Sequence, residues 1–487
     1  MERSGGVLYA GVGRRPVTPP LGIKTAGFYS REGVVTGHDG ELSATACVLR
    51  GRGRTVVIAA LDLCMAPQAV VAAWRASMAE AASTTTDHVL VNLSHTHSSG
   101  ALASTQPEFA FQRELLEAYE AMLGRQLRAA TEDAVADLRA ARIGAGAGRS
   151  QLGIQRRETG ADGYVFLGEV PDGPIDPVVG VVRVDDLDGR PIAVLAAYGC
   201  HTVTVGPRAS VASADFPGPM RDLVERTLGG TCLFLQGGGG DVMPCWGMGH
   251  ELDNQDGKER IGWMLGGEVL AVAAAIRTHV TRGERVSIPS LLGPGQTMRP
   301  LVPIEGETCT TLGAFSESVA LDLVPLPSLE RATELRAERE ADLAAALASG
   351  SERAIQIARH FAAWAETLVD AVREGRRSVT MEVQALRIND IVFTAIAAEA
   401  FSATTRAIRE GSPWAATIAL GYSNGVLCYL PTADAYPAGG WDVADRYRIP
   451  DMVFQSYLLP VALAPDSEAR VRAAALDLVA RLSADTA

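Results

Sequence analysis

The chain has 487 residues, 47% of them hydrophobic and 21% charged, a composition typical of a globular protein with a large core. Its formal net charge of −13 and its pI near 5.2 argue against a nucleic-acid partner. Because no apolar run reaches the roughly 18–20 residues of a membrane span and no leader follows Met1, we expect no signal peptide and no stable membrane insertion. Seven scattered cysteines without a CxxC pair indicate reduced thiols and a cytoplasmic protein. A homo-oligomer is compatible with the sequence.

The first hundred residues alternate short apolar strands with one helix. The ranges 7–12, 44–49 and 55–63 are predicted strands, 68–82 is a predicted helix, and the strand from Leu90 completes a strand–helix–strand unit typical of a parallel pair. This last strand ends in His95 and His97, whose side chains share a face because they are two positions apart. Two imidazoles at a strand end suit a metal ion or a proton carrier, and a hydrogen-bonded histidine pair is the alternative.

The middle of the chain places two more polar groups after strands. A long helix is predicted for 109–141 and is broken at 144–153, and strands at 178–184 and 192–198 flank a turn. The second of these strands leads into His201. After a helix at 216–227, a strand at 231–235 ends in four glycines and Asp241. The glycine run has no P-loop lysine and no dinucleotide spacing, so it indicates close approach of the backbone to a substrate or a metal.

The last part of the chain continues the alternation of helices and strands. A helix at 254–279 and a strand at 286–297 precede two charged, alanine-rich helices at 328–375, which we interpret as a helical hairpin that either covers a pocket or is solvated. Glu399 follows paired strands at 379–388 and 390–397. Further predicted elements are a helix at 400–409, strands at 415–421 and 426–430, and a helix at 467–482. The sequence therefore predicts one α/β domain over 1–487, with mixed, largely parallel sheets, flanking helices and the 328–375 hairpin as an insertion.

Polar residues that follow strands can meet at one edge of an α/β sheet, where ligands bind. Two or three histidines and a carboxylate form a set typical of catalytic zinc, which activates water and polarises carbonyl groups. Here the set is His95, His97, His201, Asp241 and Glu399. The absence of a Gly-x-Ser-x-Gly motif disfavours a serine hydrolase.

Several segments, in chain order, resemble the neutral/alkaline, non-lysosomal ceramidases. NLSHTHS at 92–98 resembles the family's "THTHSGP" segment, and AYGCHTVT at 197–204 with SADFPG at 213–218 is similar to its second histidine region. LQGGGGDVMP at 235–244 resembles the "GDVSP" loop. Residues 398–401 and 421–429 resemble the last two site segments, and Ala26-Gly27-Phe28 resembles a Gly-aromatic segment near the start.

The resemblance implies a set of site residues. Zn²⁺ would be held by His95, His201, Glu399 and Tyr429, the last of which would otherwise be interpreted as a core tyrosine. His97 would carry protons, Arg156 (with Arg157 as a rival) would bind the substrate oxygen or an oxyanion, and Asp241 would orient a ligand or water. Substrate contacts are assigned to Gly27, Met243 and Trp441.

Three departures from the family pattern concern the substrate. Met243 stands where the family has a serine, Trp441 replaces a tyrosine, and the family's C-terminal β-sandwich and secretory signal are not expected. A thioether neither attacks a carbonyl nor relays a proton, so ceramide is not the expected substrate. We predict a zinc-dependent hydrolase of an amide (N-acyl) bond in another small molecule. The alternatives are a zinc esterase, lactonase or biosynthetic cyclase, and a non-catalytic ligand-binding homologue.

Overall fold

The computed structural model describes residues 7–28, 31–245, 255–290, 293–304, 310–441, 443 and 452–484. Two stacked sheets lie at its centre. The strands of these sheets are β1 (Leu8–Pro16), β3 (Ser43–Gly51), β4 (Arg54–Leu61), β5 (Val89–Leu93), β6 (Arg139–Arg149), β9 (Val178–Asp186), β10 (Pro191–Tyr198), β12 (Thr231–Gln236), β18 (Leu312–Asp322), β19 (Ser378–Ile388), β20 (Ile391–Ile396) and β22 (Ala416–Leu420). The larger sheet has the order β12–β10–β9–β6–β1–β3–β4–β5, and the smaller has the order β18–β19–β20–β22.

Helices cover the outer face of each sheet, so the molecule has four layers. One apolar core joins the inner faces of the two sheets and includes Ile58 and Leu195 from the larger sheet and Phe393 from the smaller. On the outer side of the larger sheet lie α1 (Gln68–Ala82), α2 (Arg113–Ala136), α3 (Pro217–Leu228) and α4 (Gln255–Ala275). On the outer side of the smaller sheet lie α7 (Ser402–Gly411) and α10 (Ser467–Ala484).

The mixed α/β class is confirmed, but the expectation of largely parallel pairing needs correction. In the larger sheet only the edge pairs β4–β5 and β10–β12 are parallel, each joined through a helix as the strand–helix–strand pattern predicts. The pairs between them are antiparallel. The apolar runs reflect coverage by a helix on one face and by the second sheet on the other, which buries both faces without requiring parallel strands.

Strand β6 occupies a range that the sequence indicates as a helix end and a break. Three of its alternate residues are Gly144, Gly146 and Gly148, and a Cβ atom at each would lie within 3.1 Å of side chains from α4 or the turn after it. Glycine is unfavourable in strands unless another element approaches closely. The glycines therefore made this segment look like a break, although they allow a helix to pack directly on the strand.

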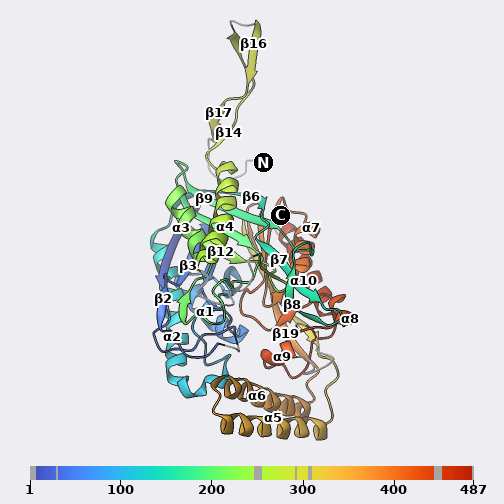
Figure 1. Ribbon diagram of the computed structural model, residues 1–487. Helices are drawn as coiled ribbons and strands as arrows, with labels where there is room; N and C mark the ends of the chain where they lie inside the picture. The colour runs from blue at the N-terminus through green and yellow to red at the C-terminus, as the bar shows by residue number, and fades with distance from the viewer. Residues whose placement is uncertain are drawn as a thin grey trace.

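Two hairpins leave the four-layer body in different directions (Figure 1). The predicted 328–375 hairpin is formed by α5 (Leu329–Ser349) and α6 (Glu352–Glu374), each begun by a serine cap, and it lies at one end of the molecule beside α9 (Met452–Ser456). At the other end, β14 (Val280–Arg282) and β17 (Leu301–Pro303) continue into β15 (Val286–Ser290) and β16 (Gly293–Met298). The single strand predicted for 286–297 is therefore a hairpin. Among the described helices, none combines the length and apolarity of a membrane span.

The larger sheet curves until its two edge strands approach each other, and the buried Asn92 joins them. Its Oδ1 accepts from the backbone N–H of Gln236 at 2.6 Å, and its Nδ2 donates to the Gln236 carbonyl at 3.1 Å. The same Nδ2 reaches the carbonyl of Gly421, after β22, at 2.9 Å. One side chain therefore brings together the ends of β5, β12 and β22, and His95 of the candidate site lies just after β5.

Candidate metal centre and active site

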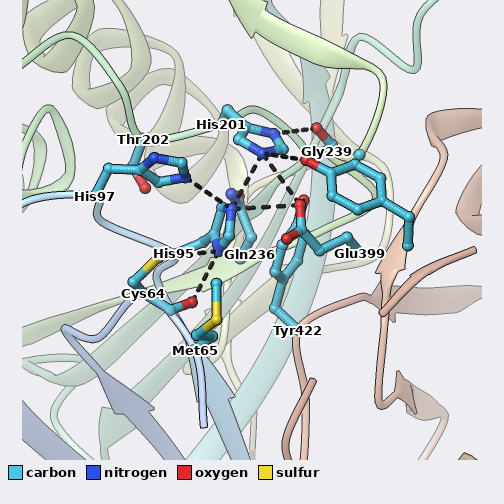
Figure 2. A network of polar contacts seen from close by, with 12 residues as sticks. Cys64, Met65, His95, His97, His201, Thr202, Gln236, Gly239, Glu399 and Tyr422 are labelled. Carbon is cyan, nitrogen blue, oxygen red and sulfur yellow. Dashed lines mark hydrogen bonds and ion pairs between the residues drawn. The ribbon is translucent and has the colours of Figure 1, made fainter. Parts of the chain in front are cut away.

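Four side chains from different strand ends converge on one point, three of which are labelled in Figure 2. The Nε2 atoms of His95, after β5, and His201, after β10, lie 3.1 Å apart. Glu399 Oε2 lies 3.3 Å from His95 Nε2 and 3.1 Å from His201 Nε2. Tyr429 Oη lies 3.2 Å from His201 Nε2. Glu399 and Tyr429 begin β21 (Glu399–Ala400) and β23 (Tyr429–Leu430), which pair in parallel with these two residues opposite each other.

The orientation of the two histidines fits a metal ion. His95 Nδ1 is 2.8 Å from the Cys64 carbonyl and His201 Nδ1 is 2.6 Å from the Gly239 carbonyl. Since carbonyl oxygens only accept, each Nδ1 carries a proton, and the Nε2 atoms of both rings face each other and Glu399. Arg156 Nη2 lies 3.1 Å from His201 Nε2, and although burial lowers the pKa of His95, the charges of Glu399 and Cys64 raise it to about 10, so this set favours positive charge between its members, as a bound metal would supply. Tetrahedral ligands with bonds of about 2.0–2.1 Å lie roughly 3.3 Å from one another, which matches the spacing of this set and fits zinc.

The backbone at this point is held in unusual conformations. His95 has a φ of +60°, a left-handed conformation that costs a non-glycine residue roughly 1–3 kcal/mol. Its N–H donates to the Leu63 carbonyl at 2.9 Å, which holds the turn after β5. In the glycine run, a Cβ atom at Gly240 would lie 2.6 Å from the Glu399 carbonyl. The glycines therefore allow close approach to the centre, as the sequence pattern indicates.

Burial and charge set the protonation of these groups. Burial lowers the pKa of His201 to about 3, assisted by the charge of Arg156. Glu399 is wholly buried, and although burial opposes ionisation, His95 and His201 hold its pKa well below its usual range. Burial raises the pKa of Tyr429 well above its usual range, and Arg156 only partly offsets this. The phenol is therefore protonated unless a further positive charge lies beside it.

His97 lies beside this set rather than within it. Its Nε2 is 3.1 Å from His95 Nε2, its ring packs edge-on against Phe28 with centroids 4.7 Å apart, and its Nδ1 meets no hydrogen-bond partner among the described residues. Gly27 has a φ of +95°, and a Cβ atom there would lie 2.4 Å from the His97 ring. Gly27 is thus required for His97 to occupy its place. Burial lowers the pKa of His97 well below its usual range, so its ring is neutral.

The structure separates the two candidate arginines. Arg156, on β7 (Gly153–Thr159), donates through Nη2 to Tyr429 Oη at 2.7 Å and to the Gly240 carbonyl at 2.8 Å, and its guanidinium lies 4.7 Å from the centre of the Trp441 ring. Arg157 donates instead to the Gly439 carbonyl at 2.9 Å. Because successive strand residues face opposite sides, only Arg156 lines the cavity at the centre.

Two predicted site residues, Asp241 and Met243, do not line the cavity at the centre. Asp241 accepts from the backbone N–H of Ser402, the first residue of α7, at 2.7 Å and from Gln155 Nε2 at 2.9 Å. It therefore fixes the start of a helix and the strand that carries Arg156. Met243, on β13 (Val242–Pro244), is 3% exposed and packs with Ile154 and Val203 behind the cavity wall.

Two tyrosines without a predicted role hold Glu399. Tyr422 donates to Glu399 Oε2 at 3.3 Å and lies beside the His95 ring, with centroids 4.5 Å apart. Tyr457 donates to Glu399 Oε1. Tyr422 lies inside the 421–429 segment that resembles the ceramidases, so that segment could have marked it as a residue near the site. Nothing in the sequence around Tyr457 distinguishes it from a core tyrosine.

The centre opens into a cavity of about 370 Å³ with two kinds of wall. We call His95, His97, Arg156, His201, Glu399 and Tyr429 the strand-end wall. The helix-borne wall comprises Glu108 and Phe109 from η2 (Pro107–Gln112), Gln356 from α6, and Val453 and Ser456 from α9. Gly27, Phe28 and Trp441 also line the cavity. Its volume suits a small-molecule ligand.

Comparison with known proteins connects the chain to solved structures alone. No protein-family model and no curated protein matches it. A structure described as ceramidase complexed with C2 matches with a TM-score of 0.67 and 16% identity, over 98% of this chain and 76% of that chain. The neutral ceramidase from Pseudomonas aeruginosa matches with a TM-score of 0.65 and 17% identity, over 98% of this chain and 75% of that chain. The chain therefore shares the fold of these ceramidases.

Proposed function

We propose that this protein is a zinc-dependent hydrolase that cleaves an amide (N-acyl) bond in a small molecule. The observation that carries the proposal is the convergence of His95, His201, Glu399 and Tyr429 at the base of a cavity that Arg156 also lines. Both solved structures reported above are ceramidases. When bound, a zinc ion would polarise a carbonyl oxygen and acidify a water molecule.

The chain's own residues would supply charge stabilisation and proton transfer. Arg156 is 3% exposed, and its guanidinium is fixed by Tyr429, the Gly240 carbonyl and the Trp441 ring. A fixed cation with several donors stabilises negative charge as it develops on the acyl oxygen. His97 Nε2 lies at the edge of the set, 3.1 Å from His95 Nε2, a position from which it would take a proton from the attacking water and return it to the leaving amine.

Glu399 is prepared for its role by the residues around it. Tyr422 donates to one of its oxygens and Tyr457 to the other, which fixes the plane of the carboxylate. Outer contacts of this kind orient metal-binding groups and commonly affect affinity by about 10–100-fold. The arrangement supports a role for Glu399 as a ligand rather than as a mobile general base.

The experiment that tests the proposal combines metal analysis with a substrate panel. The full chain is purified, its zinc content is measured, and kcat/KM is determined for N-acyl amides, matched esters and lactones. We expect about one zinc per chain and hydrolysis of amides. Esters or lactones turned over in place of amides would assign the site to the alternative chemistry, and ligand binding without any turnover would indicate a binding protein.

A matched pair of histidine variants tests the ligand assignment. His95→Ala should lose both zinc and turnover, whereas His88→Ala, at a histidine bonded to Thr85 outside the cavity, should keep both. Zinc far below one per chain in the wild type, or full activity in His95→Ala, would exclude the proposed mechanism.

A further inference from the structure

The helix-borne wall contains a buried carboxylate that the proposed chemistry does not use. Glu108, on η2, is 3% exposed and lines the cavity. Its Oε2 lies 3.0 Å from His360 Nδ1, and the described part of the chain offers no hydrogen bond to Oε1. Because Glu108 lines the cavity and His360 contacts only its Oε2, Oε1 is left free to accept a hydrogen bond from a ligand in the cavity.

The side chain of Glu108 is held in place from α6 and α9. His360, on α6, is 1% exposed, and its other ring nitrogen lies 3.2 Å from the Gln455 carbonyl of α9. Farther along α6, Trp364 Nε1 donates to the Leu459 carbonyl at 2.9 Å. These contacts fix both the carboxylate and the helix that carries its partner, so Oε1 has a defined position.

A second set of contacts fastens the start of α6 to the other side of the cavity. The buried Lys24 pairs with Glu352, and Gln356 Nε2 donates to the same carboxylate at 2.9 Å. Lys24 immediately precedes Thr25, which begins the cavity-lining stretch that reaches Phe28. Because Lys24 pairs with Glu352, it does not neutralise Glu108. Among the described residues of the helix-borne wall, Glu108 is the acidic side chain that lines the cavity.

We propose that Glu108, oriented by His360, is a specificity-determining residue that binds a hydrogen-bond-donating group, a hydroxyl or an ammonium, on the substrate at a point away from the scissile bond. This inference rests on the proposed function for the reaction that the substrate undergoes. The recognition of the substrate is argued from the helix-borne wall alone. A substrate with a purely hydrocarbon group at this wall would leave Glu108 Oε1 without a donor, since His360 contacts Oε2. Sites built around such a bond strongly reject analogues that lack it.

The test compares three N-acyl amides that differ only at the end of the acyl chain: a hydroxyl, an ammonium and a methyl group. Wild-type protein should prefer one or both donor-bearing substrates over the methyl analogue by about 100-fold in kcat/KM. The hydroxyl and ammonium arms identify which donor the site takes. A wild-type preference for the methyl analogue would overturn the inference without any variant being needed.

Two variants locate the preference at Glu108. In Glu108→Leu, which removes both acceptor oxygens at similar size, the preference should fall to within a few-fold, and an unchanged zinc content shows that the fold is retained. Glu117→Leu, which removes an exposed carboxylate of α2, is the matched control and should keep the preference. An undiminished preference in Glu108→Leu would refute the assignment.

Failure of the proposed function can be distinguished from failure of this inference. Calorimetric binding of the corresponding acids, terminated by hydroxyl, ammonium or methyl, does not require turnover. Donor-selective binding that Glu108→Leu abolishes would support the site even if no amide is cleaved. Amide hydrolysis without any donor preference would leave the proposed function standing and refute the role of Glu108.

Discussion

The two walls of the cavity are constructed by different means. The strand-end wall is fixed by backbone pairing: β21 and β23 place Glu399 opposite Tyr429, and Asn92 joins the edges of the larger sheet near His95. The helix-borne wall is fixed by side chains from distant segments, such as His360 with Glu108. The sheets carry the candidate metal ligands, and the helices carry the wall that we propose selects the substrate.

The largest effect should follow from breaking the strand-end wall itself. His201→Ala removes one of the two proposed imidazole ligands and leaves Glu399 and Tyr429 buried without it. Since even outer contacts of metal ligands are worth about 10–100-fold, loss of a ligand should reduce activity by more than about 100-fold. Zinc content and kcat/KM measure this outcome. Normal zinc content in the variant would show that the ligand set is wrong.

A smaller loss is expected when a supporting contact is removed. Tyr422→Phe deletes the hydroxyl that donates to Glu399 Oε2 but keeps the ring beside His95. We expect zinc affinity to fall by about 10–100-fold, measured by competition with a chelating dye. Tyr198→Phe, which removes another buried hydroxyl bonded to the Ser150 carbonyl, serves as the control. Equal zinc affinities in the two variants would exclude the supporting role of Tyr422.

The strand-end wall could be predicted from the sequence in large part, whereas the helix-borne wall could not. Histidines and a glutamate placed just after apolar strands could be identified as a candidate centre, because strand ends are marked by periodicity and turn residues. Tyr457 could not, since it reaches Glu399 from a segment near the end of the chain whose approach depends on the packing of α9. Glu108 and His360 lie 252 positions apart, and no local pattern links them. Strand β6 was hidden because its glycines are explained only by the helix packed on them.

Loosening the helix-borne wall should change selectivity and leave the metal in place. Lys24→Met removes the ion pair that ties α6 to the segment before Thr25. Because Glu352 is half exposed, the free energy of unfolding should fall by only about 1 kcal/mol. The ratio of kcat/KM between donor-bearing and methyl-terminated amides should fall several-fold with zinc content unchanged. Loss of zinc would mean that the two walls are not separable.

Met243 should give the smallest effect, and it tests what its departure from the family pattern means. The side chain packs with Ile154 and Val203 and does not line the cavity. Met243→Leu conserves volume, so it should cost less than about 1.5 kcal/mol and leave kcat/KM within two-fold of wild type. Met243→Ser introduces the hydroxyl of the resembled motif but buries it behind the wall, so we expect lower stability and no gain of activity toward long-chain N-acyl amides. A gain of more than about ten-fold, relative to Met243→Leu, would show that the buried position reaches the reacting groups. A residue that does not line the cavity would then contribute to activity.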